Sequence, residues 1–234
     1  MQNLQETTAV ILAGGLGTRL RSIVSDRQKV IAKVGDKPFI TYLLDELDQI
    51  GINKVILCVG YLGDQVQAAL GSQYKGMQLI YSQEPKPLGT GGALRFALHL
   101  MNSEQIMILN GDSFCQANLT AFWNSHLEKQ SAISLLLVRV ADSSPFGKVE
   151  IDAKSRVLSF CEKGQKGNGW VNAGVYLFQR KILETLPAGT CSIEKDIFPK
   201  WVGKGLMGYC CRGKFLDIGT PSAYSASQHF FHLS

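Results

Sequence analysis

Apolar positions in the first half of the chain follow a strand pattern and a helix pattern in turn. The apolar run Thr8–Ala13 (TAVILA) ends at Gly14 and Gly15, which predicts a buried strand leading into a glycine loop. In Pro38–Ile50 the apolar residues recur at helical spacing, and Gly51 suits the end of that helix. This alternation with short links predicts an α/β fold with a doubly wound, mostly parallel sheet and helices on both faces. Further strands are predicted over Lys54–Val59, Met77–Tyr81 and Gln105–Leu109, and further helices over Asp64–Leu70 and Gly91–Met101.

The second half has a different pattern, with short strand-like runs close together. Such runs joined by tight turns predict an antiparallel extension over the sheet. Helices are expected near Ile193–Val202 and Ser222–Phe231. No long linker or internal repeat interrupts the 234 residues, so we expect one domain over residues 1–234 whose character changes near residue 130. The predicted strands cover Ser131–Val140, Gly147–Ile151, Val157–Phe160 and Trp170–Phe178.

Composition is that of an ordinary globular protein, with 45% apolar and 18% charged residues. The longest apolar runs, such as Ala132–Val138, are too short to span a bilayer, and the polar Met1–Thr8 lacks the pattern of a signal peptide. A cytoplasmic location without a membrane partner is therefore expected. Six cysteines without C-x-x-C spacing predict free thiols in a reducing compartment. The net charge of +5 could indicate nucleic acid, but the Lys and Arg residues are scattered without a basic run, and binding of small polyanions explains the excess equally well. No nucleic-acid partner is therefore expected.

The glycine loop reads LAGGLGTRLR over residues 12–21. Glycines after a first strand let backbone N–H groups approach a phosphate, although a tight turn would also use them. A dinucleotide fingerprint would need a third glycine where Leu20 stands, and no Walker A sequence occurs. Arg19 closes the loop with a planar guanidinium that suits phosphate oxygens. Lys29 follows ten residues later between apolar residues, and we interpret it as a second phosphate contact or a surface charge.

An ordered set of motifs extends over nearly the whole chain. After LAGGLGTRLR and Lys29 come PLGTGGAL, NGD, FGKVEID, CEKG, VNAGVYLF, IEKDIFP and FLDIGTPSAY. Together they resemble the sugar-1-phosphate nucleotidylyltransferase family, and most of all the short bacterial D-glycero-α-D-manno-heptose 1-phosphate guanylyltransferases. The resemblance implies a Rossmann-like nucleotidyltransferase fold, with a nucleotide half over residues 1–130 and a sugar-phosphate half over residues 131–234. It also implies GTP and a sugar 1-phosphate as partners; the oligomeric state stays open, a homo-oligomer included.

The resemblance implies a role for each matching residue. Arg19 and Lys29 are the expected catalytic residues, and Asp112 and Asp217 are expected to bind Mg²⁺, the implied cofactor. The nucleotide is expected to contact Leu12, Ala13, Gly14, Gly15, Gly17, Thr18, Glu84, Gly89, Thr90 and Gly111. The sugar phosphate is expected to contact Gly147, Glu162, Lys163, Asn172 and Glu194.

One departure from the family pattern concerns the loop around Lys29. Relatives usually have Pro-Lys-Pro there and another proline three residues later. This chain has Gln28, Lys29 and Val30, and then Lys33. The lysine is kept, but the prolines that stiffen its loop are absent.

The chemistry implied is attack by a sugar-phosphate oxygen on the α-phosphorus of a nucleoside triphosphate. Both reactants are anions, so fixed positive charge and positioning lower the barrier. The nucleophile is already ionised and needs no general base. Asp112 follows a predicted parallel strand, where such sheets bind ligands, and Mg²⁺ takes one or two carboxylates plus phosphate oxygens. Local sequence alone also allows Asp112 as a turn residue and Asp217 as a helix cap.

Glu84 is the residue that we expect to bind the base of the nucleotide. Relatives that transfer thymidylyl or uridylyl groups have Gln five residues before the glycine that matches Gly89. A carboxylate only accepts hydrogen bonds, so Glu84 matches the adjacent N1–H and N2–H groups of guanine and predicts GTP. The alternative is that Glu84 is an ordinary loop carboxylate and Gln83 faces the base.

Two other classes of function are alternatives to an active enzyme. A silent homologue that binds a nucleotide sugar and regulates a partner would be expected to lose Arg19, Lys29 or a metal aspartate, and this chain keeps them. A dinucleotide-dependent oxidoreductase is disfavoured because its fingerprint fails. Mannose 1-phosphate is the alternative to the heptose substrate.

Overall fold

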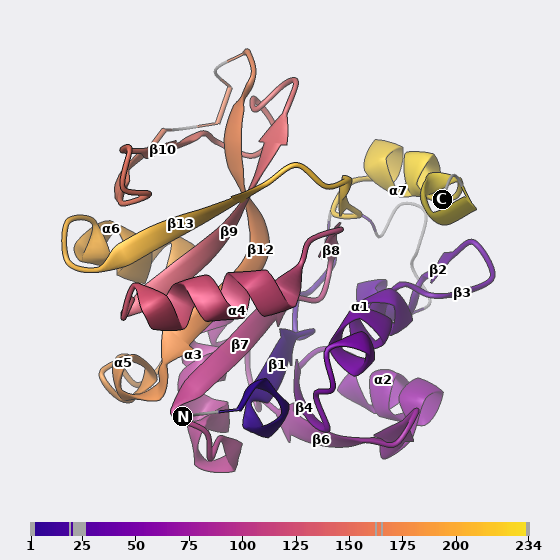
Figure 1. Cartoon of the computed structure of the whole chain (residues 1–234). Helices are drawn as coiled ribbons and strands as arrows, with labels where there is room; N and C mark the ends of the chain where they lie inside the picture. Colours follow the sequence, from indigo (N-terminus) through magenta and orange to yellow (C-terminus); the bar gives the residue numbers. More distant parts are fainter. Residues whose placement is uncertain (1–2, 19, 21–26, 162, 165, 233–234) are drawn as a thin grey trace.

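The computed structural model describes residues 3–18, 20, 27–161, 163–164 and 166–232. Its centre is four parallel strands in the order β6 (Met77–Gln83), β4 (Lys54–Val59), β1 (Thr8–Leu12) and β7 (Gln105–Asn110) (Figure 1). These are the strands that the apolar runs predict, with β6 two residues longer than expected. Short apolar runs without alternation suit strands buried on both faces. The parallel centre of the α/β fold is confirmed.

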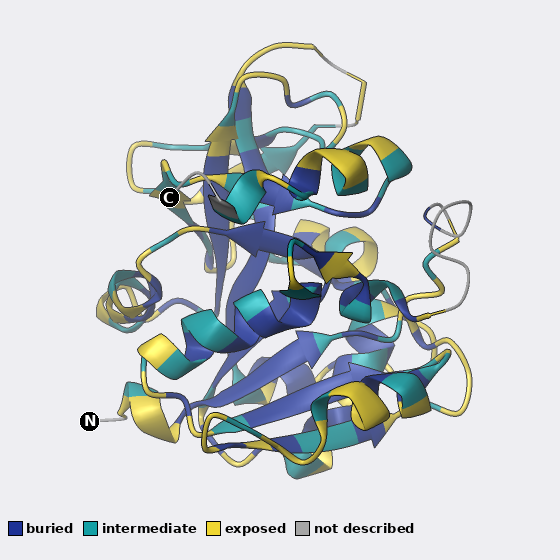
Figure 2. Cartoon of the chain, turned by 90° about the vertical axis from the view of Figure 1, so that its right-hand side faces the viewer, coloured by how far each residue is buried: buried dark blue, intermediate teal, exposed yellow. Residues whose placement is uncertain are grey.

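Helices cover both faces of this sheet, as the alternation of elements predicts. Ala9 and Ile11 point to the face covered by α1 (Phe39–Gln49), α2 (Gly63–Leu70) and α4 (Leu119–Glu128). Val10, between them, points to the face covered by α3 (Gly89–Ala97), α5 (Arg180–Glu184) and α6 (Phe198–Trp201). Figure 2 shows the strands buried in the middle, with the exposed sides of the helices turned outward. The two apolar cores are therefore separated by the sheet itself.

The second half of the chain extends the same sheet. The strand β12 (Gly169–Gln179) lies antiparallel to β7, and β9 (Ile133–Val140) lies antiparallel to β12. The hairpin of β10 (Val149–Ile151) and β11 (Val157–Phe160) joins the amino-terminal end of β12 through β10. One expectation is corrected here, because the extension continues the sheet edge to edge instead of lying over it. A strand that the sequence analysis does not predict, β13 (Leu206–Cys211), pairs with β9 in parallel.

Several boundaries and elements differ from the sequence prediction. The helix α3 begins at Gly89 and continues after Ala97 as the 3₁₀ turn Leu98–Leu100. The predicted helix near Ile193–Val202 is a π-helical turn, Ile193–Ile197, followed by α6. At the end of the chain α7 (Pro221–Ser227) precedes the 3₁₀ turn Phe230–His232. The remaining short elements are the 3₁₀ turns Leu4–Glu6 and Lys29–Ile31 and the strands β2 (Lys33–Val34), β3 (Lys37–Pro38) and β5 (Gln73–Tyr74).

The helix α4 was missed, although the sequence carries its signals. The Asn118 side chain accepts a hydrogen bond from the backbone N–H of Ala121 at 2.8 Å, which caps the helix. Leu119, Phe122 and Trp123 then follow at helical spacing and are buried in the core. No helix of the described ranges is long and apolar enough to cross a membrane.

Two short paired strands connect the segment that follows β7 to a segment in the last part of the chain. After β7, β8 (Ser113–Cys115) pairs antiparallel with β14 (Phe215–Asp217), in the register Ser113 to Asp217. Thr220 then caps α7 through its hydroxyl. This pairing of segments about a hundred positions apart is what brings Asp112 and Asp217 to one edge of the sheet.

Candidate functional site

A pocket of about 370 Å³ lies where the four parallel strands end. Leu12, Cys58 and Asn110 come from the ends of β1, β4 and β7, and Glu84 follows directly after β6. The carboxyl ends of parallel strands are where doubly wound sheets bind ligands, because the flanking loops diverge there. The other lining residues are Ala13, Gly14, Gly15, Leu16, Gln28, Lys29, Val30, Pro87, Gly89, Thr90, Ala93, Asp112 and Glu194.

Most of the expected nucleotide residues line this pocket. Gly17, Thr18 and Gly111 do not, and neither do Asp217, Gly147, Lys163 and Asn172. Arg19 and Glu162 lie outside the described residues. Gly111 has a packing role: its N–H donates to the Leu12 carbonyl at 2.9 Å, and a Cβ there would lie 2.7 Å from that oxygen. The expected residues that do line the pocket are Leu12, Ala13, Gly14, Gly15, Lys29, Glu84, Gly89, Thr90, Asp112 and Glu194.

Glu84 is held against the glycine loop. A Cβ on Gly14 would lie 3.1 Å from Glu84 Oε1, and one on Gly60 would lie 2.8 Å from it, so both glycines leave room for the carboxylate. The Leu88 N–H donates to Glu84 Oε2 at 3.2 Å. Burial raises the pKa of Glu84, and the hydrogen bond from Leu88 opposes that rise. Glu84 therefore presents a partly desolvated acceptor to the pocket, whereas Gln83 is not among the lining residues.

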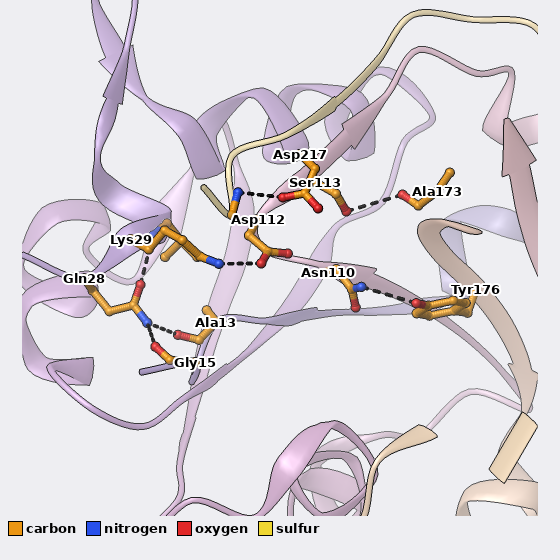
Figure 3. A network of polar contacts seen from close by, with 12 residues as sticks. Ala13, Gly15, Gln28, Lys29, Asn110, Asp112, Ser113, Ala173, Tyr176 and Asp217 are labelled. Atoms are coloured by element: carbon orange, nitrogen blue, oxygen red, sulfur yellow. Dashed lines mark hydrogen bonds and ion pairs between the residues drawn. The ribbon is translucent and has the colours of Figure 1, made fainter. Parts of the chain in front are cut away.

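Lys29 meets Asp112 in the pocket, where its ammonium forms an ion pair with Asp112 Oδ2 (Figure 3). The Ile218 N–H donates to the Asp112 carbonyl at 2.9 Å, which places Asp217 beside Asp112. Asp217 Oδ1 accepts the Gly219 N–H at 2.6 Å.

The two aspartates suit a magnesium ion that is shared with a phosphate. Among the described residues, no cluster of three or more His, Cys, Asp or Glu side chains could hold a metal by itself. Mg²⁺ commonly takes one or two carboxylates and completes its octahedron with water and phosphate oxygens. Asp112 and Asp217 on neighbouring segments match that donor set.

A buried tyrosine joins the residues expected at the sugar site. Asn172 and Asn110 donate through Nδ2 to the Tyr176 hydroxyl at 3.0 and 3.2 Å, and that hydroxyl donates to Glu194 Oε1 at 3.4 Å. Tyr176 is fully buried, and burial followed by the charge of Glu194 raises its pKa well above the usual value. Tyr176 therefore stays protonated and fixes Glu194 relative to Asn110.

The motif PLGTGGAL, in the first half of the chain, is hydrogen-bonded to a segment of the second half. The Gly91 and Gly92 N–H groups donate to the Cys191 carbonyl at 2.8 and 3.2 Å. The Thr90 hydroxyl donates to Glu194 Oε2 at 2.8 Å and accepts the Ile193 N–H at 2.9 Å. The first turn of α3 thus packs against the segment that carries Glu194, which brings Glu194 to the pocket.

Gly147 and Lys163 are brought together elsewhere. Gly147 has φ +83°, and a Cβ there would lie 2.8 Å from the Cys161 carbonyl and 3.8 Å from the Lys163 side chain. Lys163 is exposed. Both residues sit at the end of the β10–β11 hairpin, outside the pocket.

Sequence reasoning missed Gln28, Asn110 and Tyr176. Asn110 and Tyr176 stand inside the recognised motifs NGD and VNAGVYLF, so polar residues in apolar strands were the available signal. In the sequence, Gln28 is only the residue that stands where the family pattern has a proline. Nothing local in the sequence shows which backbone groups its amide reaches.

The fold and the pocket define a doubly wound α/β protein whose ligand site lies at the carboxyl edge of its parallel strands. The family model for nucleotidyl transferases matches residues 8–232, so the chain belongs to this family and is a nucleotidyltransferase.

Relatives and solved structures agree with this membership. The chain is 36% identical over 222 residues to the D-glycero-alpha-D-manno-heptose 1-phosphate guanylyltransferase of Aneurinibacillus thermoaerophilus, covering 94% of this chain and 96% of the relative. It is 33% identical over 225 residues to the mannose-1-phosphate guanylyltransferase of Mycobacterium tuberculosis, covering 94% of this chain but 63% of the relative. The crystal structure of HddC from Yersinia pseudotuberculosis complexed with GMP-PN superposes with a TM-score of 0.87 at 32% identity, over 96% of this chain and 99% of that one.

Proposed function

We propose that this protein transfers GMP from GTP to a sugar 1-phosphate, releasing pyrophosphate and forming a GDP-sugar. The observation that carries the proposal is Glu84, an acceptor held against the glycine loop in the pocket. Guanine offers two adjacent donors to such a carboxylate, whereas uracil, thymine and cytosine place an acceptor where one oxygen would lie. The two named guanylyltransferase relatives support the same base.

Within this proposal different residues bind the phosphates of GTP, the metal ion and the sugar. The glycine loop and Lys29 bind the phosphates of GTP, and Arg19 is assigned to the same task from the sequence. A sugar-phosphate oxygen forms a bond to the α-phosphorus while the bond from that phosphorus to the bridging oxygen of pyrophosphate breaks, so no proton has to move. Asp112 and Asp217 would hold Mg²⁺, which offsets negative charge on the reacting phosphates. Asn172 and Glu194, fixed by Tyr176, are assigned to the sugar.

D-glycero-α-D-manno-heptose 1-phosphate is the sugar substrate that we propose. The support is the relative from Aneurinibacillus thermoaerophilus, which is 36% identical to this chain over 222 residues. Mannose 1-phosphate is the second candidate, favoured by the relative from Mycobacterium tuberculosis. The GDP-heptose product would serve the synthesis of a surface polysaccharide.

The test is a substrate matrix read by pyrophosphate release. GTP, ATP, CTP, UTP and dTTP are each paired with heptose 1-phosphate and mannose 1-phosphate, and kcat/KM is compared. We expect GTP with the heptose 1-phosphate to be used best. Better use of another triphosphate would overturn the base, and a clear preference for mannose 1-phosphate would overturn the sugar. Binding of a GDP-sugar without turnover in any pairing would indicate a silent homologue.

A further inference from the structure

The Gln28 side chain connects the glycine loop to the turn that carries Lys29. Gln28 is 3% exposed, and its Nε2 donates to the Ala13 carbonyl at 2.7 Å and to the Gly15 carbonyl at 2.9 Å (Figure 3). Both amide hydrogens of one side chain are therefore directed at backbone oxygens of the glycine loop.

The other atoms of Gln28 hold the Lys29 turn. Its Oε1 accepts the Val30 N–H at 2.9 Å and so caps the 3₁₀ turn Lys29–Ile31. Its backbone N–H donates to Gln65 Oε1 at 3.2 Å, on α2. A primary amide both donates and accepts, a carboxylate only accepts, and an apolar side chain does neither. Of these three kinds of side chain, only an amide can make the whole set of contacts.

These contacts fix the orientation of the peptide groups in the glycine loop. A peptide unit is planar and trans, so its C=O and N–H point in opposite directions. With the Ala13 and Gly15 carbonyls directed at Gln28, the N–H groups of Gly14 and Leu16 point away from it. The same side chain fixes the start of the turn from which Lys29 reaches Asp112.

We infer that Gln28 is a positioning residue that sets the glycine loop and Lys29 in one arrangement for phosphate binding. The inference rests on the role proposed for Lys29 and the glycine loop. Where the family pattern has prolines, this chain has backbone N–H groups at positions 28 and 30, and the amides of Gln65 and Gln28 satisfy both. Hydrogen bonds to the Gln65 and Gln28 amides thus hold the segment where the family pattern has proline rings.

The test compares Gln28→Met and Gln28→Glu with a matched control, Gln179→Ala. Gln28→Met keeps the size but loses every side-chain hydrogen bond, and Gln28→Glu keeps the acceptor for Val30 but loses both donors. Gln179 also donates to a backbone carbonyl, that of Ser131 at 2.9 Å, at the opposite end of the sheet. We expect kcat to fall about 10- to 100-fold in both Gln28 variants, since small displacements of positioned groups have effects of this size. KM for the triphosphate should change less than kcat, and Gln179→Ala should behave as wild type.

Two further measurements separate positioning from plain stability. The thermal midpoints of folded Gln28→Met and Gln179→Ala are compared, and the Gln28→Met change is repeated in a Lys29→Met background. If Gln28 acts through Lys29, its substitution should add little to the loss caused by Lys29→Met. Wild-type kcat in Gln28→Met, or a defect in Gln28→Glu alone, would overturn the inference. Wild-type kcat in Lys29→Met would instead overturn the proposed role of Lys29.

Discussion

The thiol sulfurs of Cys115 and Cys211 lie 3.4 Å apart, although the two residues are 96 positions apart in the chain. Cys115 ends β8, the strand that begins directly after Asp112, and Cys211 ends β13, six residues before Asp217. The contact therefore joins the two segments that bring the aspartates together. No disulfide is formed by any of the six cysteines.

The first prediction concerns the reactivity of Cys211. The hydrogen bond between the two thiols lowers the pKa of Cys211 below its usual value. In a Cys210→Ser background, alkylation of Cys211 by iodoacetamide should therefore show an inflection at a lower pH than an ordinary cysteine does. Adding Cys115→Ala should move the inflection upward, because the donor is lost. Peptide mapping by mass spectrometry measures both. An inflection at the pH of an ordinary cysteine that Cys115→Ala does not move would contradict the assignment.

The second prediction concerns Asp112 and Asp217. Asp112→Asn and Asp217→Asn should each fold normally and lose about 100-fold or more in kcat, because each removes a charged ligand from the proposed Mg²⁺. Raising the magnesium concentration should restore part of the rate. Asp142→Asn is the matched control, since Asp142 is an exposed carboxylate outside the pocket whose side chain accepts hydrogen bonds from Ser144. Near-wild-type rates in either site variant at saturating magnesium would remove that residue from the metal site.

The third prediction concerns the base. Glu84→Gln should weaken the use of GTP and ease the use of UTP or dTTP, because an amide can donate to a pyrimidine carbonyl. A bidentate contact to a base is worth about 1–3 kcal/mol, so the ratio of kcat/KM values should shift about 10- to 100-fold. Gln83→Ala is the control, and it should leave the preference intact. If the Glu84 variant keeps the wild-type preference while the Gln83 variant changes it, Gln83 reads the base.

The fourth prediction compares two glycines that differ in what surrounds them. A Cβ on Gly92 would lie 2.3 Å from the Gly189 carbonyl, so Gly92→Ala should lower the free energy of unfolding by about 1–3 kcal/mol through overpacking. A Cβ on Gly15 would meet nothing within 4 Å, and Gly15 lines the pocket. Gly15→Ala should therefore keep its stability and raise KM for GTP. Urea unfolding and steady-state kinetics measure the two effects, and the reverse pattern would show that the glycine loop is not a phosphate site.

The fifth prediction concerns acid stability. His126 is buried between Ser134 Oγ at 2.7 Å and Gln105 Oε1 at 3.0 Å, and burial lowers its pKa from 6.5 to about 4. Below pH 6.5 the unfolded chain binds a proton that the folded protein does not, so stability is lost as the pH falls toward 4. At pH 5 this costs about 2 kcal/mol relative to neutral pH. His126→Gln should remove that part of the loss, as urea unfolding at pH 7.5 and pH 5 would show. Equal pH dependence in both proteins would mean that folded His126 binds a proton at pH 5, and so that folding does not lower its pKa.

The sequence by itself determined the parallel centre of the sheet and the position of the glycine loop. Strand and helix periods are local, so the run Thr8–Ala13 and the helix over Pro38–Ile50 could be predicted from neighbouring positions alone. Glu84, Asp112 and Lys29 are singled out by the resemblance of the ordered motifs to a known family, since local sequence alone leaves their roles open, and all three line the pocket. The helix α4 was also predictable, from Asn118 and the spacing that follows it.

Only the tertiary structure decided which side chains meet. The Gln28 amide reaches two carbonyls of a different segment, and the Tyr176 hydroxyl joins Asn110, Asn172 and Glu194 across three elements. It also decided that β9 and β13 run parallel, and that β12 continues the sheet beside β7. Hydrophobic periodicity indicates which face of a helix or strand is buried, but it does not indicate which other helices or strands pack against that face. Contacts between positions about a hundred residues apart depend on strand order and side-chain reach, which arise only when the sheet assembles.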